Sequence, residues 1–128
     1  MNDIKLMNKA ADNIRILAAS MVEKAKSGHP GGAMGGADFV NVLFSEFLVY
    51  DPKNPAWEGR DRYFQDPGHM SPMLYSVLAL AGKFTIDELK EFRQWGSVTP
   101  GHPEVNVMRG IENTSCLLYT SDAADDLT

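Results

Sequence analysis

Apolar and polar positions follow a helical repeat through the first part of the chain. Between Asp3 and Lys26, apolar side chains recur every three or four residues, which predicts one amphipathic helix. Asp3 is suited to the N-cap, Gly28 to the position after the C-cap, and Pro30 to the end of the helix. The apolar positions are Met7, Ala10, Ala11, Ile14, Leu17, Ala18, Met21, Val22 and Ala25.

A glycine-rich segment separates this helix from a strongly apolar one. Residues 31–36, GGAMGG, contain four glycines, which allow the backbone to approach another segment closely. From about Ala37 to Val49, apolar residues cover most of the circumference of a predicted second helix. Such a helix is expected to be buried on more than one side.

Residues 50–62, YDPKNPAWEGRDR, are rich in Pro, Asn and Gly and predict a polar, exposed connection. Arg60 and Arg62 are expected to be solvated there. Trp57, and Trp95 further along the chain, are expected to anchor packing.

The segment 62–65 contains the only strand candidate, which is short and leads into the sequence DPGHMS. A third helix is predicted with Ser71 as its N-cap, Pro72 in its first turn and Gly82 near its end. The first residues of a fourth helix, Thr85-Ile86-Asp87-Glu88, form a capping box, and that helix is expected to reach about Trp95. The sequence pattern therefore predicts a mostly helical chain.

Composition excludes some classes of protein but does not indicate a function. The chain has 128 residues, 44% of them apolar and 23% charged, which is typical of one globular domain. A net charge of −5 does not favour binding to nucleic acid or to an anionic membrane. No apolar run is long enough to span a bilayer, and the N-terminus does not resemble a signal peptide. A cytoplasmic protein is expected.

The last residues read differently from the rest of the chain. Cys116 to Asp126 match, without a gap, the translation of a transposase-end adapter used in shotgun sequencing libraries. Residues 116–128 are therefore interpreted as an artefactual tail on a natural part of 1–115, the alternative being a short natural tail. The only cysteine and three aspartates would then fall outside the natural part, whose net charge would be −2. On this interpretation the chain is the N-terminal piece of a longer protein.

The chain has three histidines, and each follows a glycine: His29 in SGHPGG, His69 in DPGHMS and His102 in TPGHPE. Each follows the end of a predicted element. In an α/β protein such ends meet at one edge of the sheet, where ligands bind.

Three interpretations of these histidines remain open. Each could simply follow a helix-ending glycine at the surface. Three imidazoles could bind zinc, although their wide spacing does not support it. Alternatively, imidazoles and glycine N–H groups could face an anionic, polyhydroxylated ligand, to which histidine can donate a hydrogen bond or a proton.

Taken together, SGHPGGAMGGAD, DPGHMS and TPGHPE resemble the N-terminal region of transketolase, the thiamine diphosphate enzyme of the pentose phosphate pathway. The three motifs occur in this order in that family, and the resemblance covers essentially 1–115, including DELKEFRQW. It implies an α/β fold with a parallel sheet flanked by helices, of which this chain is a mostly helical part.

The resemblance also implies roles for individual residues. His29 corresponds to a catalytic histidine that contacts the sugar substrate and assists proton transfer. His102 corresponds to one that binds the donor's terminal hydroxymethyl group and is likewise assigned to catalysis. Gly68 and His69 correspond to residues that bind the cofactor. Family members transfer a two-carbon ketol unit between sugar phosphates and form homodimers with thiamine diphosphate and Mg²⁺.

The sequence departs from the family after Ser115. A Gly-Pro-Leu-Gly-Gln-Gly run is expected there, where Cys116 stands, and the family's magnesium-binding Gly-Asp-Gly…Asn motif does not follow. No metal ligand is therefore assigned in this chain, and the chain alone is expected to be inactive. The alternatives are a related thiamine-dependent enzyme, the N-terminal subunit of a split transketolase, or a non-catalytic binding or regulatory module.

Overall fold

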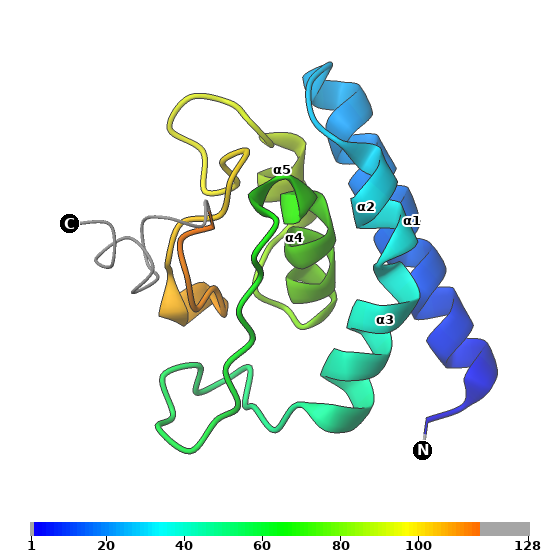
Figure 1. The fold of residues 1–128 in the computed structure, drawn as a ribbon, viewed down its shortest axis with the longest axis vertical. Helices are drawn as coiled ribbons and strands as arrows, with labels where there is room; N and C mark the ends of the chain where they lie inside the picture. The colour runs from blue at the N-terminus through cyan, green and yellow to red at the C-terminus, as the bar shows by residue number, and fades with distance from the viewer. Residues whose placement is uncertain (1, 116–128) are drawn as a thin grey trace, which may run out of the picture.

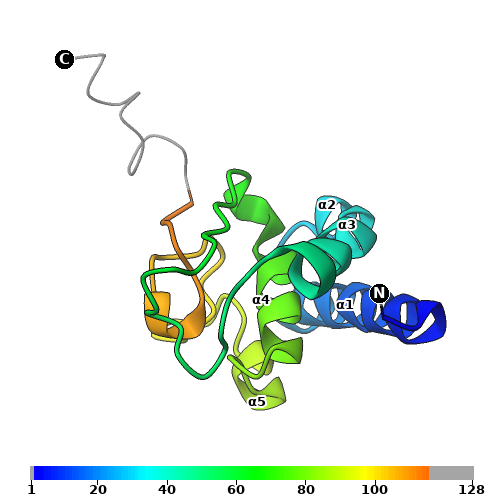
Figure 2. The same ribbon diagram turned by 90° about the horizontal axis from the view of Figure 1, so that it is seen from below.

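The computed structural model describes residues 2–115. The long helix α1 lies along one side, α2 and α3 pack beside it, and α4 occupies the centre (Figure 1). Seen from below, the irregular segments that follow α5 cover the side of α4 opposite α1 (Figure 2). The helical elements are α1 (Ile4–Ala25), α2 (Pro30–Gly35), α3 (Ala37–Val42), the π-helical turn η1 (Leu43–Phe47), the 3₁₀ turn η2 (Gly68–Met70), α4 (Ser71–Leu80), α5 (Ile86–Lys90) and the 3₁₀ turn η3 (Val107–Arg109).

The start of α1 follows the sequence prediction. The Asp3 carboxylate accepts a hydrogen bond from the Lys5 N–H at 2.7 Å, which confirms it as the N-cap. The buried face of α1 repeats at three- or four-residue intervals, so the amphipathic pattern is also confirmed. Its buried residues are Ala11, Ile14, Ala18 and Met21.

The end of α1 differs from the prediction. Lys26, with φ 52°, adopts the left-handed conformation expected of Gly28. Gly28 has φ 130°, which few other residues adopt. Pro30 does not simply stop a helix, because it is the first residue of α2.

The GGAMGG segment is helical, and its glycines allow the close approach that the sequence predicts. A Cβ on Gly36 would lie 2.6 Å from the Met73 Sδ. A Cβ on Gly32 would lie 3.0 Å from the Met70 Sδ. The two glycines therefore let α2 pack directly against η2 and α4.

The second predicted helix is divided into α3 and η1, and it is not buried on more than one side of this chain. Val40 and Phe44 belong to the core. Phe39 and Phe47, on the opposite face, are 62% and 69% exposed. Helical periodicity predicts which residues share a face, but only the packing partners decide how many faces are buried.

The strand predicted at 62–65 is wrong, because residues 2–115 contain only one isolated bridge, between Asn106 and Ile111. The backbone of Gln65 bonds to side chains instead of a neighbouring strand. Its N–H donates to the Asn113 Oδ1 at 3.2 Å, and its carbonyl accepts from the Ser115 Oγ at 2.7 Å. These contacts hold the segment that leads into His69.

The 50–62 connection is only partly exposed. Arg60 is not solvated, because its guanidinium donates to both carboxylate oxygens of Glu112 at 2.6 and 2.9 Å, and each side chain is only 9% exposed. Trp95 is fully exposed, so the packing role predicted for it is wrong, whereas Trp57 is 42% exposed and its ring lies against Gly59. The ion pair between Arg60 and Glu112 ties the 50–62 connection to the last described residues.

Helix α4 begins one residue earlier than predicted and is buried along most of its length. Met70, rather than Ser71, is the N-cap, because the Ser71 hydroxyl donates to Gly101 and not to its own helix. Gly82, with φ 81°, follows the end of the helix as expected. No helix in the described part of the chain is long and apolar enough to cross a membrane.

The capping box of α5 is present, since Thr85 and Glu88 each accept from the other's backbone N–H. The helix nevertheless ends at Lys90 rather than near Trp95. Arg93 at φ 61° leaves the helical region and turns the chain toward the third Gly-His sequence.

Candidate functional site

Two of the three predicted site histidines lie against each other. His29 is the N-cap of α2, and His69 lies in η2, directly before α4. Their rings meet edge to face, with centroids 5.3 Å apart and planes inclined at 78°. Both side chains are exposed. The packing of α2 against η2, which the glycines permit, thus brings together residues 40 positions apart in the sequence.

The third histidine joins them through Gly68. This glycine is buried, and a Cβ on it would lie 3.2 Å from the His102 Cγ and 2.7 Å from the Ser115 carbonyl oxygen. The ring of His102 therefore rests against the backbone that carries His69. The convergence of the three Gly-His segments is confirmed, although within residues 2–115 they meet between helices and not at a sheet edge.

Helix α4 holds the loop before His102 through two hydroxyl groups one turn apart. The Tyr75 hydroxyl donates to the Pro100 carbonyl at 2.6 Å, and the Ser71 hydroxyl donates to the Gly101 carbonyl at 2.6 Å. Both side chains are fully buried, and burial raises the pKa of the Tyr75 hydroxyl. The hydroxyl therefore stays protonated and donates at any physiological pH.

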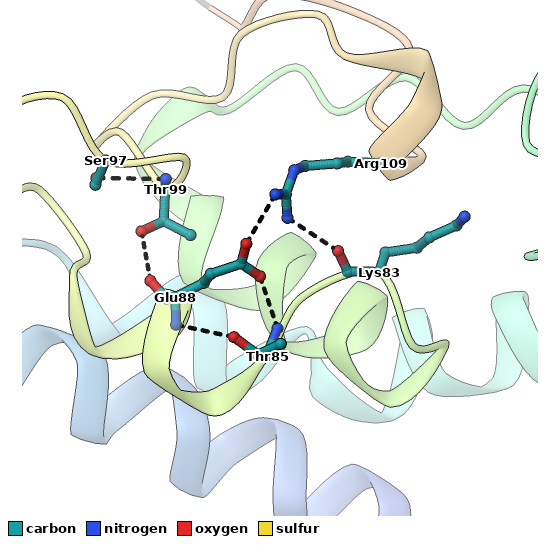
Figure 3. Close-up of polar contacts among 6 residues, drawn as sticks. All are labelled: Lys83, Thr85, Glu88, Ser97, Thr99 and Arg109. Carbon is teal, nitrogen blue, oxygen red and sulfur yellow. Dashed lines mark hydrogen bonds and ion pairs between the residues drawn. The ribbon is translucent and has the colours of Figure 1, made fainter.

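A second anchor for this loop comes from α5 (Figure 3). The Thr99 hydroxyl donates to the Glu88 carbonyl at 3.0 Å. The Glu88 carboxylate accepts from Arg109 at 2.7 Å and from the Thr85 N–H at 2.8 Å, and the same guanidinium donates to the Lys83 carbonyl. The Arg109 hydrogen bond, helped by the Thr85 N–H, lowers the pKa of Glu88 from 4.5 to about 2. This network links the start of α5, the loop before His102 and η3.

Sequence reasoning missed these anchoring residues. Ser71 was assigned to a helix cap, and no role was given to Tyr75. Their four-residue spacing on a largely apolar helix is the signal that could have found them, because buried hydroxyl groups need a partner. The identity of that partner could not be read from the sequence.

The imidazoles are available to a ligand. No hydrogen bond or ion pair joins His29, His69 or His102 to another residue within 2–115. Each can therefore form a hydrogen bond with a ligand oxygen. The described residues contain no group of three His, Cys, Asp or Glu side chains placed to hold a metal ion, so the geometry offers no support for a zinc site.

Comparison with known proteins identifies the family. The family model for the thiamine diphosphate-binding domain of transketolase matches residues 6–120. The match extends past Ser115, so the predicted boundary of the natural part stays a prediction, and residues 116–128 lie outside the described residues.

Individual transketolases match most of this chain. Transketolase 1 of Escherichia coli is 50% identical over 106 residues, covering 82% of the chain and 16% of that protein. The crystal structure of transketolase from Campylobacter jejuni has a TM-score of 0.83 and 45% identity, covering 89% of this chain and 18% of that one. Transketolase from Pichia stipitis in complex with sedoheptulose 7-phosphate has a TM-score of 0.81 and 42% identity, covering 86% and 16%.

The chain thus spans about a sixth of the length of the transketolases it matches. The region of similarity contains all three Gly-His segments, whose convergence the structure describes. Because the family model covers most of its residues, the chain belongs to the transketolase family and corresponds to part of the thiamine diphosphate-binding domain.

Proposed function

We propose that this chain forms one part of the cofactor and sugar site of a transketolase, which transfers a two-carbon ketol unit from a ketose phosphate to an aldose phosphate. The observation that carries the proposal is the convergence of His29, His69 and His102 in a member of this family. Sugar phosphates are the proposed substrates, in line with the sedoheptulose 7-phosphate complex of the Pichia stipitis relative.

The residues present fit a polar, anionic ligand, because packing brings together three exposed imidazoles that have no hydrogen-bond partner among residues 2–115. Gly68 and His69 are proposed to bind the cofactor. His29 and His102 are proposed to hydrogen-bond the sugar hydroxyl groups and to move protons at the reacting hydroxyl. Thiamine diphosphate, when bound, supplies carbanion stabilisation.

The proposal for the complete enzyme rests on family membership. The complete enzyme is proposed to be a cytoplasmic homodimer of the pentose phosphate pathway that uses Mg²⁺ with thiamine diphosphate and has a parallel sheet flanked by helices. No magnesium ligand is assigned among residues 2–115, since that range has no suitable group of three ligand side chains.

A chimera provides the test. This chain's residues replace the matching segment of Escherichia coli transketolase 1, and ketol transfer from sedoheptulose 7-phosphate to an aldose phosphate is measured. The chimera should be active. His29→Ala or His102→Ala should lower kcat/KM on the order of a hundredfold while thiamine diphosphate still binds, because positioned acid–base groups contribute about that much.

His69→Ala should instead weaken thiamine diphosphate binding, measured by calorimetry. Lys53→Ala, an exposed change in the 50–62 connection, is the matched control and should alter neither quantity. The 128-residue chain alone should show no ketol transfer. A folded chimera that neither binds the cofactor nor transfers would refute the proposal and favour a non-catalytic binding module.

A further inference from the structure

Arg93 lies between the loops that carry two of the three histidines. Its Nη1 donates to the Ser27 Oγ at 2.9 Å, two residues before His29. Its Nε lies so close to Gly101 that a Cβ there would be 2.9 Å away, one residue before His102. One guanidinium therefore contacts both histidine-bearing loops.

The glycines before these histidines make room for this side chain and its neighbour. A Cβ on Gly28 would lie 3.2 Å from the Phe92 ring and 3.7 Å from the Arg93 Nε. A Cβ on Gly101 would lie 3.2 Å from the Arg93 Cζ as well. The guanidinium therefore excludes a side chain at Gly101. At Gly28 the nearest atoms are the Val22 Cγ2 at 3.0 Å and the Phe92 ring, and Arg93 is in ordinary van der Waals contact.

Arg93 is held there at a cost. Its φ of 61° lies in the left-handed region, which is unfavourable for a side chain of this size. Its Nε–H is buried and has no hydrogen-bond partner among residues 2–115. Its backbone N–H donates to the Thr99 carbonyl at 3.0 Å, which fixes it to the loop before the third histidine. Strained backbone and unpartnered buried donors recur at functional sites.

We propose, on the basis of the function proposed above, that Arg93 is a positioning residue that sets the separation of His29 and His102. It acts through the two loops and not on the substrate. A lysine cannot replace it, because an ammonium on a flexible stem cannot pack closely against Gly101 and bond the Ser27 hydroxyl at once.

The first experiment uses the 128-residue chain and needs no activity. Nuclear Overhauser contacts are measured between the His29 and His69 rings, and between the His102 ring and the Gly68 Hα. Arg93→Lys should weaken both contacts. Arg62→Lys is the matched control, because that exposed guanidinium donates only to backbone carbonyls among residues 2–115, and it should leave both contacts intact.

A second variant perturbs the contact between Arg93 and Gly101 without changing Arg93 itself. Gly101→Ala places a methyl group 2.9 Å from the Arg93 Nε and should also weaken both ring contacts. Gly35→Ala, where the new Cβ meets nothing within 4 Å, is its matched control and should not. The amide spectrum of each variant reports whether the chain stays folded.

The second experiment uses the chimera. Arg93→Lys should lower kcat/KM by about tenfold or more, because a misplacement near 1 Å can cost on the order of a hundredfold. The affinity for thiamine diphosphate should be unchanged, since Arg93 acts on the loops at Ser27 and Gly101 and not through Gly68 and His69, the residues proposed to bind the cofactor. A merely structural role would lower both together.

Unchanged ring contacts in both Arg93→Lys and Gly101→Ala would overturn the inference, as would loss of the folded amide spectrum in both. A parallel loss of cofactor affinity and kcat/KM would also overturn it. If the chimera with Arg93 is itself inactive, the proposed function fails, whereas the ring contacts still decide whether Arg93 sets the separation of the histidines.

Discussion

Removing the Tyr75 hydroxyl tests whether α4 holds the loop that leads into His102. The side chain is fully buried, and its hydroxyl donates to the Pro100 carbonyl at 2.6 Å. Its ring also packs against Phe84 and Phe92, with centroids 5.4 and 6.2 Å away. Tyr75→Phe keeps these ring contacts and removes only the hydrogen bond.

The expected loss follows from the hydrogen bond alone. A net contribution near 1 kcal/mol is typical, and leaving a buried partner unsatisfied costs about 1–3 kcal/mol. The Pro100 residue is partly exposed, so water can reach it, and the lower part of this range applies. Tyr75→Phe should therefore reduce the free energy of unfolding by about 1–2 kcal/mol, or the Tm by about 4–10 °C in a domain near this size.

The assay is urea unfolding followed by circular dichroism at the helical band. Tyr63→Phe is the matched control, because its hydroxyl lies at 3.5 Å from the Gln65 Oε1, at the limit of a hydrogen bond, and should contribute less than about 0.5 kcal/mol. The reasoning is refuted if Tyr75→Phe destabilises no more than Tyr63→Phe. Ser71→Ala should resemble Tyr75→Phe, and the double variant should be non-additive because both residues hold one loop.

Three further predictions concern acid stability, the contact behind His69, and the start of α1. Because the folded pKa of Glu88, about 2, lies below the ordinary 4.5, its contribution to stability is complete above pH 4.5 and is lost as the pH falls toward 2. The Tm should therefore depend less steeply on pH across this range in Glu88→Gln than in the unmodified chain. An unchanged dependence of Tm on pH would contradict the assignment. Gly68→Ala should destabilise by about 1–3 kcal/mol, because its Cβ would stand 2.7 Å from the Ser115 carbonyl. Gly35→Ala, whose Cβ would meet no other segment of residues 2–115 within 4 Å, should be neutral or mildly stabilising in the same denaturation assay. Asp3→Ala should lower the free energy of unfolding by about 1 kcal/mol through loss of the N-cap of α1. Equal stability of this variant and the unmodified chain would show that the Asp3 cap does not stabilise the helix in solution.

Local chemistry in the sequence was sufficient for several features. The Asp3 cap and the Thr85 capping box were predicted because a side chain and the backbone a few residues away satisfy each other without the rest of the protein. The same local logic failed where another segment competes. Ser71 resembles a cap, yet its hydroxyl bonds the Gly101 carbonyl, 30 residues away.

The sequence also determined which residues are candidates for the chemistry. Three Gly-His segments, together with their order and surroundings, indicated the family and the candidate site, and glycine is required where the backbone approaches another segment closely, as at Gly36 and Gly68. Their convergence depends on contacts between residues 30 to 70 positions apart, which helical periodicity does not encode.

Only the tertiary structure decided how the site is held. Packing of α2 against η2 places His29 beside His69, and Gly68 places His102 beside them. The tertiary structure also shows that the Arg93 guanidinium fills the space left open at Gly101 and bonds the Ser27 hydroxyl beside Gly28. The physical reason is steric and long-range: a missing Cβ is visible in the sequence, but the atom that takes its place is visible only in the fold.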